Sequence, residues 1–259
     1  MPFLMPTRNE AVVYFEQQIE VGPAQDFVTR WNERHPESKT TLFQIIVFAL
    51  MRTIALRDDL NRFVVGRRLY QRRGIDLSFA VKKELTDGAG LTTVKVRFDR
   101  DDTLETALGK IAARIGEGKG QRRLQSETEM AIVTRLPRSL VRFIVFAQRF
   151  LDYWNLLPAS LIDGDPLYAS LFLANLGSVG LDSAYHHLFE YGTTPLFATI
   201  GKVHKAIVVG PGDVPVVREV VSIKYSFDER IADGLYCAKS LAIFKRWMED
   251  PDALGQPLA

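Results

Sequence analysis

A cluster of carboxylates near the C-terminus holds residue types that can carry acid–base chemistry. The segment from Tyr225 to Gly234 reads YSFDERIADG and places Asp228, Glu229 and Asp233 around Arg230, at the point where a strand is predicted to end and a helix to begin. A carboxylate at such a turn stays solvated, becomes a base whose pKa is raised by burial, or pairs with a nearby arginine. The sequence leaves all three roles open for Glu229.

Histidine is the other candidate base, because its unperturbed pKa is about 6.5. His186 and His187 are adjacent in the sequence, and one of them could serve as a base. Packing together with a hydrogen bond to the backbone is the favoured interpretation. Neither their spacing nor their neighbours indicate zinc, so we expect no metal site. His35 and His204 are interpreted as surface residues.

The composition is that of an ordinary globular protein, with 47% hydrophobic and 25% charged residues in a chain of 259. The net charge is only +2, which excludes recruitment to nucleic acid by the overall field of the protein. The single cysteine, Cys237, cannot form an internal disulfide, and the N-terminus lacks the basic segment and apolar core of a signal peptide. We therefore expect a cytoplasmic protein without a nucleic-acid partner.

Hydrophobic periodicity predicts the elements that must position these residues. Helices are predicted over 24–33, 42–56, 104–115 and 231–248. Strands are predicted over 12–21, 68–72, 75–83, 91–98, 167–173 and 196–203, with a turn at 88–90 and a hairpin of 206–209 and 214–225. This order favours an α/β class with a mixed sheet covered by helices. No linker rich in Pro, Gly or Ser divides the chain, so one domain is expected over 1–259.

The turn at 225–234 resembles the SFDHRxxDG signature of the catalytic domain of the 2-oxoacid dehydrogenase dihydrolipoyl acyltransferases, whose fold is shared with chloramphenicol acetyltransferase. Residues 174–180 (ANLGSVG) resemble that family's SNLG segment, and 198–203 (ATIGKV) resemble the strand after it. Weaker matches lie at 87–91 and in the first strand. The resemblance covers most of the chain in the same order, and it implies a two-layer chloramphenicol-acetyltransferase-like fold.

The resemblance also implies a function. Members of this family transfer an acyl group from coenzyme A to a thiol or hydroxyl, in a channel at a trimer interface. Asn175, Gly177, His186 and His187 then lie near the substrate. We accordingly expect coenzyme A or acyl-coenzyme A as a substrate and a homotrimer, either alone or as the unit of a larger assembly.

Two positions depart from the family pattern. Glu229 stands where the family has its histidine, and Ala174 stands where it has the serine that stabilises the oxyanion. Glutamate, with a pKa of about 4.3, is a poorer base than histidine by roughly 3 kcal/mol unless burial raises its pKa. Ser178 is a substitute donor four residues further along the chain. Two changes together favour loss or modification of the family's reaction.

The remaining motif residues have a structural interpretation. The resemblance implies that Asp233 is oriented by an arginine, here Arg230 or Arg8, and that it braces the turn. Gly234 is interpreted as a residue that permits close packing at the start of the last helix. Architecture is favoured over catalysis for both positions.

An insertion around 130–165 is the third departure. Arg135, Arg138, Arg142 and Arg149 lie on one helical stripe, and apolar side chains occupy the rest of a basic amphipathic helix. In order of preference, this helix packs on its own trimer or a neighbouring subunit, forms a lid over a hydrophobic pocket, or lies on a membrane surface. The near-neutral net charge places the membrane last.

No lipoyl or subunit-binding domain is expected, because the first strand lies almost at the start of the chain. The protein would then act on a free acceptor or on a carrier supplied in trans. Two functions stay open. One is a stand-alone acyltransferase with Glu229 as base, Asp233 as brace, and Ser178 or backbone amides as oxyanion donors. The other is a catalytically inactive trimeric or cage-forming structural or regulatory protein.

Overall fold

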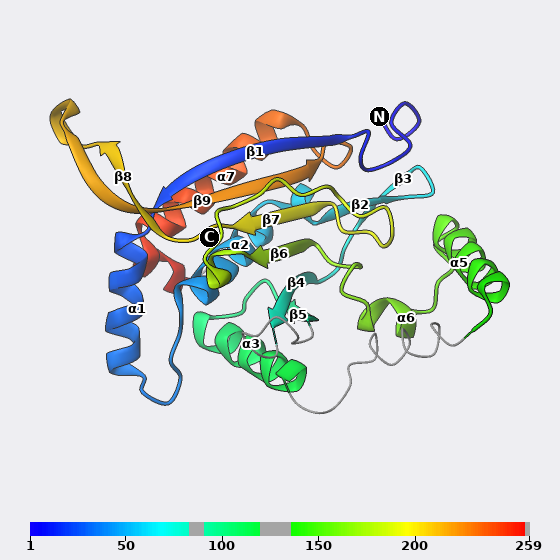
Figure 1. The fold of residues 1–259 in the computed structure, drawn as a ribbon, viewed down its shortest axis with the longest axis horizontal. Helices are drawn as coiled ribbons and strands as arrows, with labels where there is room; N and C mark the ends of the chain where they lie inside the picture. The colour runs from blue at the N-terminus through cyan, green and yellow to red at the C-terminus, as the bar shows by residue number, and fades with distance from the viewer. Residues whose placement is uncertain (83–90, 120–135, 257–259) are drawn as a thin grey trace.

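The computed structural model describes residues 1–82, 91–119 and 136–256. A seven-stranded mixed sheet has the order β1-β9-β7-β6-β4-β5, with β8 paired to β9 (Figure 1). β6 runs parallel to both of its neighbours, β4 and β7, and all the other strand pairs are antiparallel. The strands are β1 (Val12–Glu20), β4 (Ile75–Lys82), β5 (Leu91–Phe98), β6 (Leu171–Asn175), β7 (Leu196–Ile200), β8 (His204–Val209) and β9 (Pro215–Asp228). A separate hairpin is formed by β2 (Arg62–Val65) and β3 (Arg68–Gln71).

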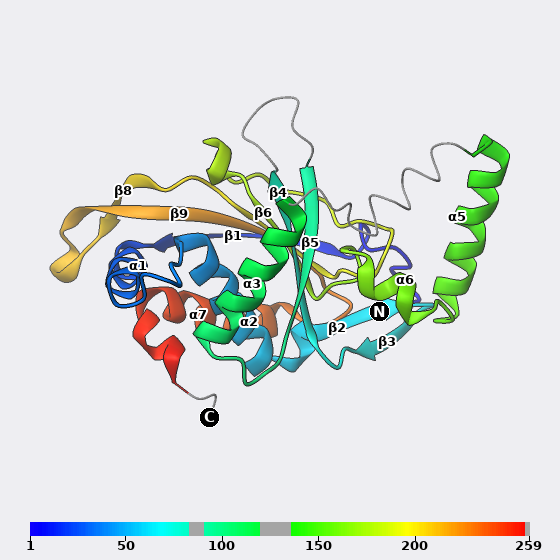
Figure 2. The ribbon, with the colours of Figure 1, turned by 90° about the horizontal axis from the view of Figure 1, so that it is seen from below.

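Helices cover one face of this sheet and form the second layer (Figure 2). They are α1 (Gly22–Arg34), α2 (Leu42–Leu56), α3 (Leu104–Lys119) and α7 (Gly234–Glu249). The central helix α2 begins with a capping box, in which the Thr41 hydroxyl accepts from the backbone N–H of Gln44 and Gln44 Oε1 accepts from the backbone N–H of Thr41. Its residues from Ile45 to Ala55 are all buried, because α2 packs on the sheet and is flanked by α1, α3 and α7. The expected mixed sheet covered by helices is therefore confirmed.

Most predicted elements are present, and several boundaries are corrected. The strand predicted to end at residue 203 ends at Ile200, and the strand predicted to end at residue 225 continues to Asp228. The strand predicted from residue 167 begins at Leu171, because the backbone of Leu167 and Tyr168 instead bonds to Asp165 in a turn. The helix predicted from residue 231 begins at Gly234, because Asp233 caps it. β2 was not predicted from the sequence, and the turn predicted at 88–90 lies outside the described residues.

The described part of the insertion, residues 136–165, contains the helices α5 (Arg138–Tyr153) and α6 (Ala159–Gly164) at one end of the molecule (Figure 1). Lys95 of β5 anchors the root of the insertion, since its Nζ donates to the carbonyl oxygens of Ile162, Asp165 and Tyr168. Arg135 of the predicted stripe lies outside the described residues. None of the helices in the described ranges combines the length and apolar content that crossing a membrane requires.

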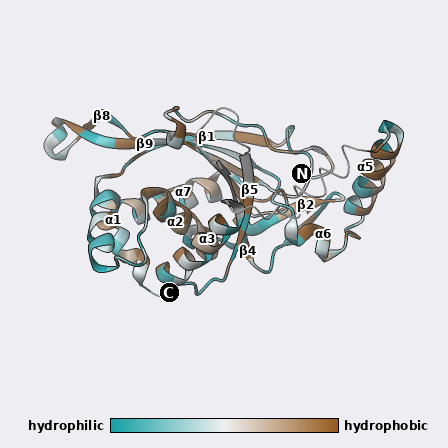
Figure 3. Ribbon diagram, turned by 60° about the horizontal axis from the view of Figure 1, so that its bottom comes forward, coloured by the Kyte–Doolittle hydropathy of each residue, from teal (hydrophilic) through white to brown (hydrophobic). Residues whose placement is uncertain are grey.

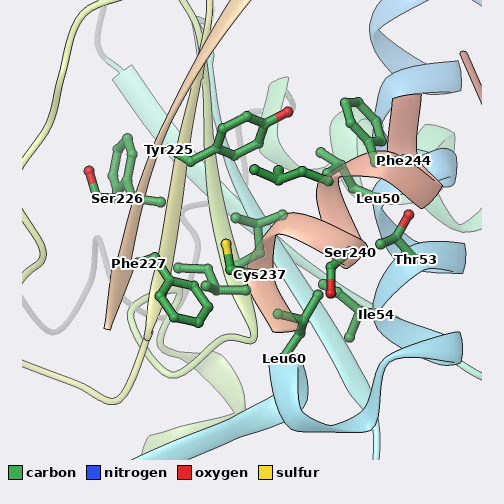
Figure 4. Close-up of a pocket in the computed structure, with 14 residues that line it drawn as sticks. Leu50, Thr53, Ile54, Leu60, Tyr225, Ser226, Phe227, Cys237, Ser240 and Phe244 are labelled. Carbon is green, nitrogen blue, oxygen red and sulfur yellow. The ribbon is translucent and has the colours of Figure 1, made fainter. Parts of the chain in front are cut away.

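A cavity of about 50 Å³ remains in the core between β9, α2 and α7. Its walls are almost entirely apolar, and the Cys237 sulfur lies among Tyr225, Phe227 and Leu60 (Figure 4). Burial raises the pKa of the Cys237 thiol to about 12. Desolvation disfavours the thiolate, so this thiol is chemically inert in the folded protein.

We predict that iodoacetamide does not alkylate Cys237 in the native protein at pH 8. The thiolate fraction at that pH is on the order of 10⁻⁴ when the protein is folded and about a quarter when it is unfolded. Because folding raises this pKa, the thiol stabilises the fold fully below about pH 8.5 and loses that contribution as the pH rises toward 12. Mass spectrometry with a urea-unfolded control tests this on the single cysteine, and rapid native labelling would contradict it.

Candidate functional site

The end of β9 is held by a buried ion pair between Asp228 and Arg230. Arg230 Nη2 lies 2.7 Å from Asp228 Oδ2, and Arg230 Nε lies 2.8 Å from Oδ1. Both side chains are almost fully buried, at 0% and 3% exposure. Such a two-point contact fixes both side chains and the backbone between them.

Two arginines join this turn to neighbouring loops. Arg230 Nη1 donates to the carbonyl oxygens of Met5 and Pro6, each at 3.1 Å. Arg8 is buried and donates to the carbonyl oxygens of Phe189, Glu190 and Gly192. Burial lowers the pKa of Arg8, and the nearby Asp228 carboxylate opposes that shift. The N-terminal segment and the loop at 189–192 are therefore fastened to the end of β9.

Glu229 lies within this fixed frame and is half-buried. Its backbone N–H donates to the carbonyl oxygen of Ala11, which holds the backbone of residue 229 against the start of β1. Its side chain has no hydrogen bond or ion pair with any residue in the described part of the chain. Pairing with an arginine is thus not realised among the described residues, and none of them occupies the carboxylate.

Asp233 is a helix cap, and the expected brace by an arginine is not formed. Its Oδ1 accepts a hydrogen bond from the backbone N–H of Tyr236 at 2.7 Å, and the side chain is exposed. Arg230 and Arg8 are bonded elsewhere, as described above. The interpretation of Gly234 is also wrong, because a Cβ at that position would meet nothing within 4 Å.

Asn175 and Ser178 lie in one turn after β6. Ser178 Oγ donates to the carbonyl oxygen of Asn175 at 2.7 Å, and Asn175 Oδ1 accepts from the backbone of Ser178 at 3.2 Å. Gly177 is needed for packing, since a Cβ there would lie 2.5 Å from the carbonyl oxygen of Gly201. Ala174 packs beside Phe172 in an apolar cluster and has no polar hydrogen to donate.

The two candidate clusters lie at opposite ends of the central strands. Asn175 is level with Ile200, which is level with Ile223. β9 runs antiparallel to β7, so from Ile223 the chain proceeds toward the opposite end of the central strands. Glu229 lies six residues after Ile223, just beyond the end of β9, which corresponds to about 20 Å along the strand. Glu229 and Ser178 of one chain therefore cannot act on the same substrate atom.

His186 and His187 pack on the face of the sheet opposite the helices. The His186 ring stacks on Phe197 at a centroid distance of 4.0 Å, and the two histidine rings stack at 4.7 Å. Nδ1 of His186 lies 2.6 Å from the carbonyl oxygen of His187, and Nδ1 of His187 lies 3.0 Å from that of Leu188. Since a carbonyl only accepts, each Nδ1 carries the proton. This is the expected packing role with a backbone hydrogen bond.

A polar cavity of about 340 Å³ beneath α5 was not anticipated from the sequence. The N-terminal segment, the β2–β3 turn, α5 and the loop at 189–192 line it. Asp152 of α5 accepts a hydrogen bond from Tyr168, and burial raises the pKa of its carboxyl above the usual range. Arg67 and Arg149 line the cavity, are exposed, and have no ion-pair partner in the described ranges. One feature of the sequence could have indicated this cavity. Asp152 is the only acidic residue of α5, whose other charged residues are arginines.

No group of three or more His, Cys, Asp or Glu that could hold a metal ion occurs within residues 1–82, 91–119 and 136–256.

Comparisons with known proteins identify the fold. A probable dihydrolipoamide acetyltransferase from Listeria monocytogenes is similar, with 14% identity, a TM-score of 0.64, and coverage of 92% of this chain and 84% of that chain. The cubic core of a pyruvate dehydrogenase multienzyme complex is similar at 15% identity and a TM-score of 0.65, covering 94% and 83% of the two chains. A chloramphenicol acetyltransferase matches at 14% identity and a TM-score of 0.52, covering 98% and 92%.

These likenesses establish the chloramphenicol-acetyltransferase-like fold that the sequence motifs implied. No protein-family model matches the chain, and no curated protein matches it.

The helix-capping role of Asp233 predicts a specific pattern of substitutions. Asp233→Ala should lower the free energy of unfolding by about 1 kcal/mol, whereas Asp233→Asn should retain it, because asparagine caps helices as well as aspartate. Gly234→Ala, next to it in open space, is the control and should change stability by less than about 0.5 kcal/mol. Urea unfolding followed by circular dichroism measures all three, and equal losses in the Ala and Asn variants would contradict the capping role.

Proposed function

We propose that this protein transfers an acyl group from a coenzyme A thioester to a thiol or hydroxyl acceptor. The acyltransferase-like fold supports a transferase of this general kind. The observation that carries the proposal is the position of Glu229. Its carboxylate has no partner among the described residues and lies in a turn held by the Asp228–Arg230 ion pair, at the place where the resemblance puts the base.

The proposal requires a site built from two copies of the chain. Glu229 and Ser178 are about 20 Å apart along the strands, so a neighbouring subunit must supply one of the two clusters. A homotrimer with identical head-to-tail interfaces meets this need, because each interface joins one end of a subunit to a different surface of the next. One of the solved structures with this fold is the cubic core of a multienzyme complex, which supports a larger assembly as well.

The proposed reaction needs one proton carrier. Glu229 takes the proton from the acceptor as its sulfur or oxygen attacks the thioester carbonyl carbon. The tetrahedral oxyanion then collapses, the carbon–sulfur bond breaks, and the coenzyme A thiolate takes the proton back from Glu229. Backbone N–H groups or Ser178 stabilise the oxyanion. Ser178 must first release the carbonyl oxygen of Asn175, to which it donates at 2.7 Å.

The cavity beneath α5 supplies positive charge next to the proposed site. Arg230 lines this cavity and directly follows Glu229 in the chain. The guanidinium groups of Arg67 and Arg149 suit a phosphate or carboxylate on one of the two substrates. The cytoplasm, where coenzyme A thioesters are available, is the compartment that fits this proposal.

We expect purified protein to bind coenzyme A and acetyl-coenzyme A saturably in calorimetric titration. Glu229→Gln should keep this binding and the fold but lower turnover at least 10²-fold, since general base catalysis contributes on that order. Glu33→Gln, an exposed glutamate on α1, is the matched control and should behave as wild type. Wild-type turnover in Glu229→Gln would eliminate Glu229 as the base.

The two-subunit site makes a separate prediction about mixed assemblies. Where Ser178 rather than the backbone is the oxyanion donor, Glu229→Gln and Ser178→Ala should each be nearly inactive alone. When equal amounts are dissociated and reassembled together, about a quarter of the interfaces combine a native Glu229 with a native Ser178. Activity should recover to about that fraction. Reassembled but inactive mixtures would show that the two residues do not share a site.

A second function is favoured by how the motif residues are used. Ser226 donates to the carbonyl oxygen of His186, Asp228 pairs with Arg230, and Asp233 caps α7. Each contact is architectural, and Ala174 cannot replace the missing serine. A trimeric structural or regulatory protein that keeps the fold without the reaction fits these contacts. If an intact oligomer does not bind coenzyme A at millimolar concentration, this structural or regulatory function is favoured over acyl transfer.

A further inference from the structure

The apolar side of helix α5 points away from the rest of the chain. At about 100° per residue, Arg138, Arg142 and Arg149 fall within an arc of about 40°. An arc of about 160° on the other side holds eight residues, and seven of them are apolar. They are Leu140, Phe143, Ile144, Phe146, Ala147, Phe150 and Leu151, with Ser139 as the exception.

The polar side of α5 is the side that meets the protein. Gln148 donates to the hydroxyl of Tyr191, and Asp152 accepts from Tyr168. The backbone at Tyr153 packs directly on Gly66 in the β2–β3 turn. An amphipathic helix of a globular protein normally turns its apolar side toward the core, so this arrangement is reversed.

The apolar side of α5 is open to solvent. Phe143 and Phe146 are each 66% exposed, and Phe150 is 55% exposed. No residue of α5 is buried, and the helix stands at the edge of the molecule with brown apolar and teal polar residues along its length (Figure 3). The apolar surface continues past the helix through Trp154, Leu156 and Leu161, which are also exposed. A patch of this kind marks an interaction surface.

The charge around this patch indicates an anionic occupant. The exposed charged side chains of α5 are its three arginines, because Asp152 is turned inward to Tyr168. Arg67 and Arg68 in the neighbouring β2–β3 turn are exposed as well. A second copy of α5 would bring the same positive charges against these, whereas anionic headgroups would be attracted to them.

The shape of the patch favours a lipid surface over a protein. The apolar face is one convex helix, and a standard protein interface needs about 20–30 residues on each side. Exposed tryptophan and arginine beside phenylalanine suit the membrane interface, where rings enter the acyl boundary and guanidinium groups extend to the headgroups. Met1, Phe3 and Leu4 are exposed as well, and the Phe3 ring lies against Arg67 of the β2–β3 turn.

We propose that the outer face of α5 docks this protein on the surface of an anionic lipid bilayer, with the helix lying in the plane of the membrane. This reverses the order of preference that the net charge suggested. A net charge of +2 for the whole chain does not describe the local surface, where arginines are concentrated at one end. The proposal does not depend on acyl transfer, and its test uses no activity.

Co-sedimentation with phosphatidylcholine vesicles, with and without phosphatidylglycerol, tests the proposal. The wild type should bind the vesicles that contain phosphatidylglycerol, more weakly as salt increases. F146E/F150E should reduce binding at least tenfold. The control I207E/V209E adds the same charge on β8, where both side chains are more than 70% exposed, and should bind as wild type. R138Q/R142Q should reduce binding roughly fivefold per arginine.

Fluorescence locates the contact. Of the three tryptophans, Trp31 and Trp247 pack against the core, and Trp154 is exposed next to α5. Anionic vesicles should shift the emission to the blue in the wild type but not in W154F. Circular dichroism checks the folding of each variant.

Two results would overturn the proposal. Equal vesicle binding by F146E/F150E and I207E/V209E would remove α5 as the docking element. A wild type that ignores vesicles, with F146E/F150E lowering the oligomer size in sedimentation velocity, would assign the face to another copy of the chain.

Discussion

The buried ion pair of Asp228 and Arg230 is the constraint on which the functional end of this molecule depends. Burying two charges is costly unless each is paired and its remaining hydrogen-bonding groups are satisfied. Arg230 meets this condition by donating to Asp228 and to two carbonyl oxygens of the N-terminal segment. Removing either partner would leave an uncompensated charge in the interior. The turn that carries Glu229 is therefore sensitive to any change that removes one member of this pair.

Sequence periodicity was sufficient for the layers of the fold because each layer has a distinct pattern. α2 is apolar on all sides, and its predicted bounds, 42–56, are those of the structure. β5 alternates, and its bounds also agree. Two of the boundary errors arose where a polar side chain bonds to the backbone and delays the start of an element, as Asp165 does before β6 and Asp233 does before α7. Such contacts are local, but hydrophobic patterns do not record them.

The candidate site was less predictable for a different reason. The motif residues Asp228, Arg230 and Asp233 were found from the sequence, but their contacts were not. Asp233 bonds to a backbone N–H of its own helix, and Arg230 bonds to Asp228 and to carbonyl oxygens of the distant N-terminal segment. The helical stripe of α5 was also correct. Periodicity gives the angle between its arginines and phenylalanines but not which side meets the protein. That orientation depends on single contacts, such as the hydrogen bond from Gln148 to Tyr191. Such contacts cannot be predicted from composition or periodicity.

The opposite placement of Glu229 and Ser178 on the sheet has a consequence for how the proposed activity would respond to dilution. A residue pair that no single chain can assemble exists only while subunits are associated, so its abundance follows mass action. Specific activity would then fall as protein concentration approaches the dissociation constant of the oligomer, with every chain still folded. The strand geometry would thus make expression level itself a control on catalysis.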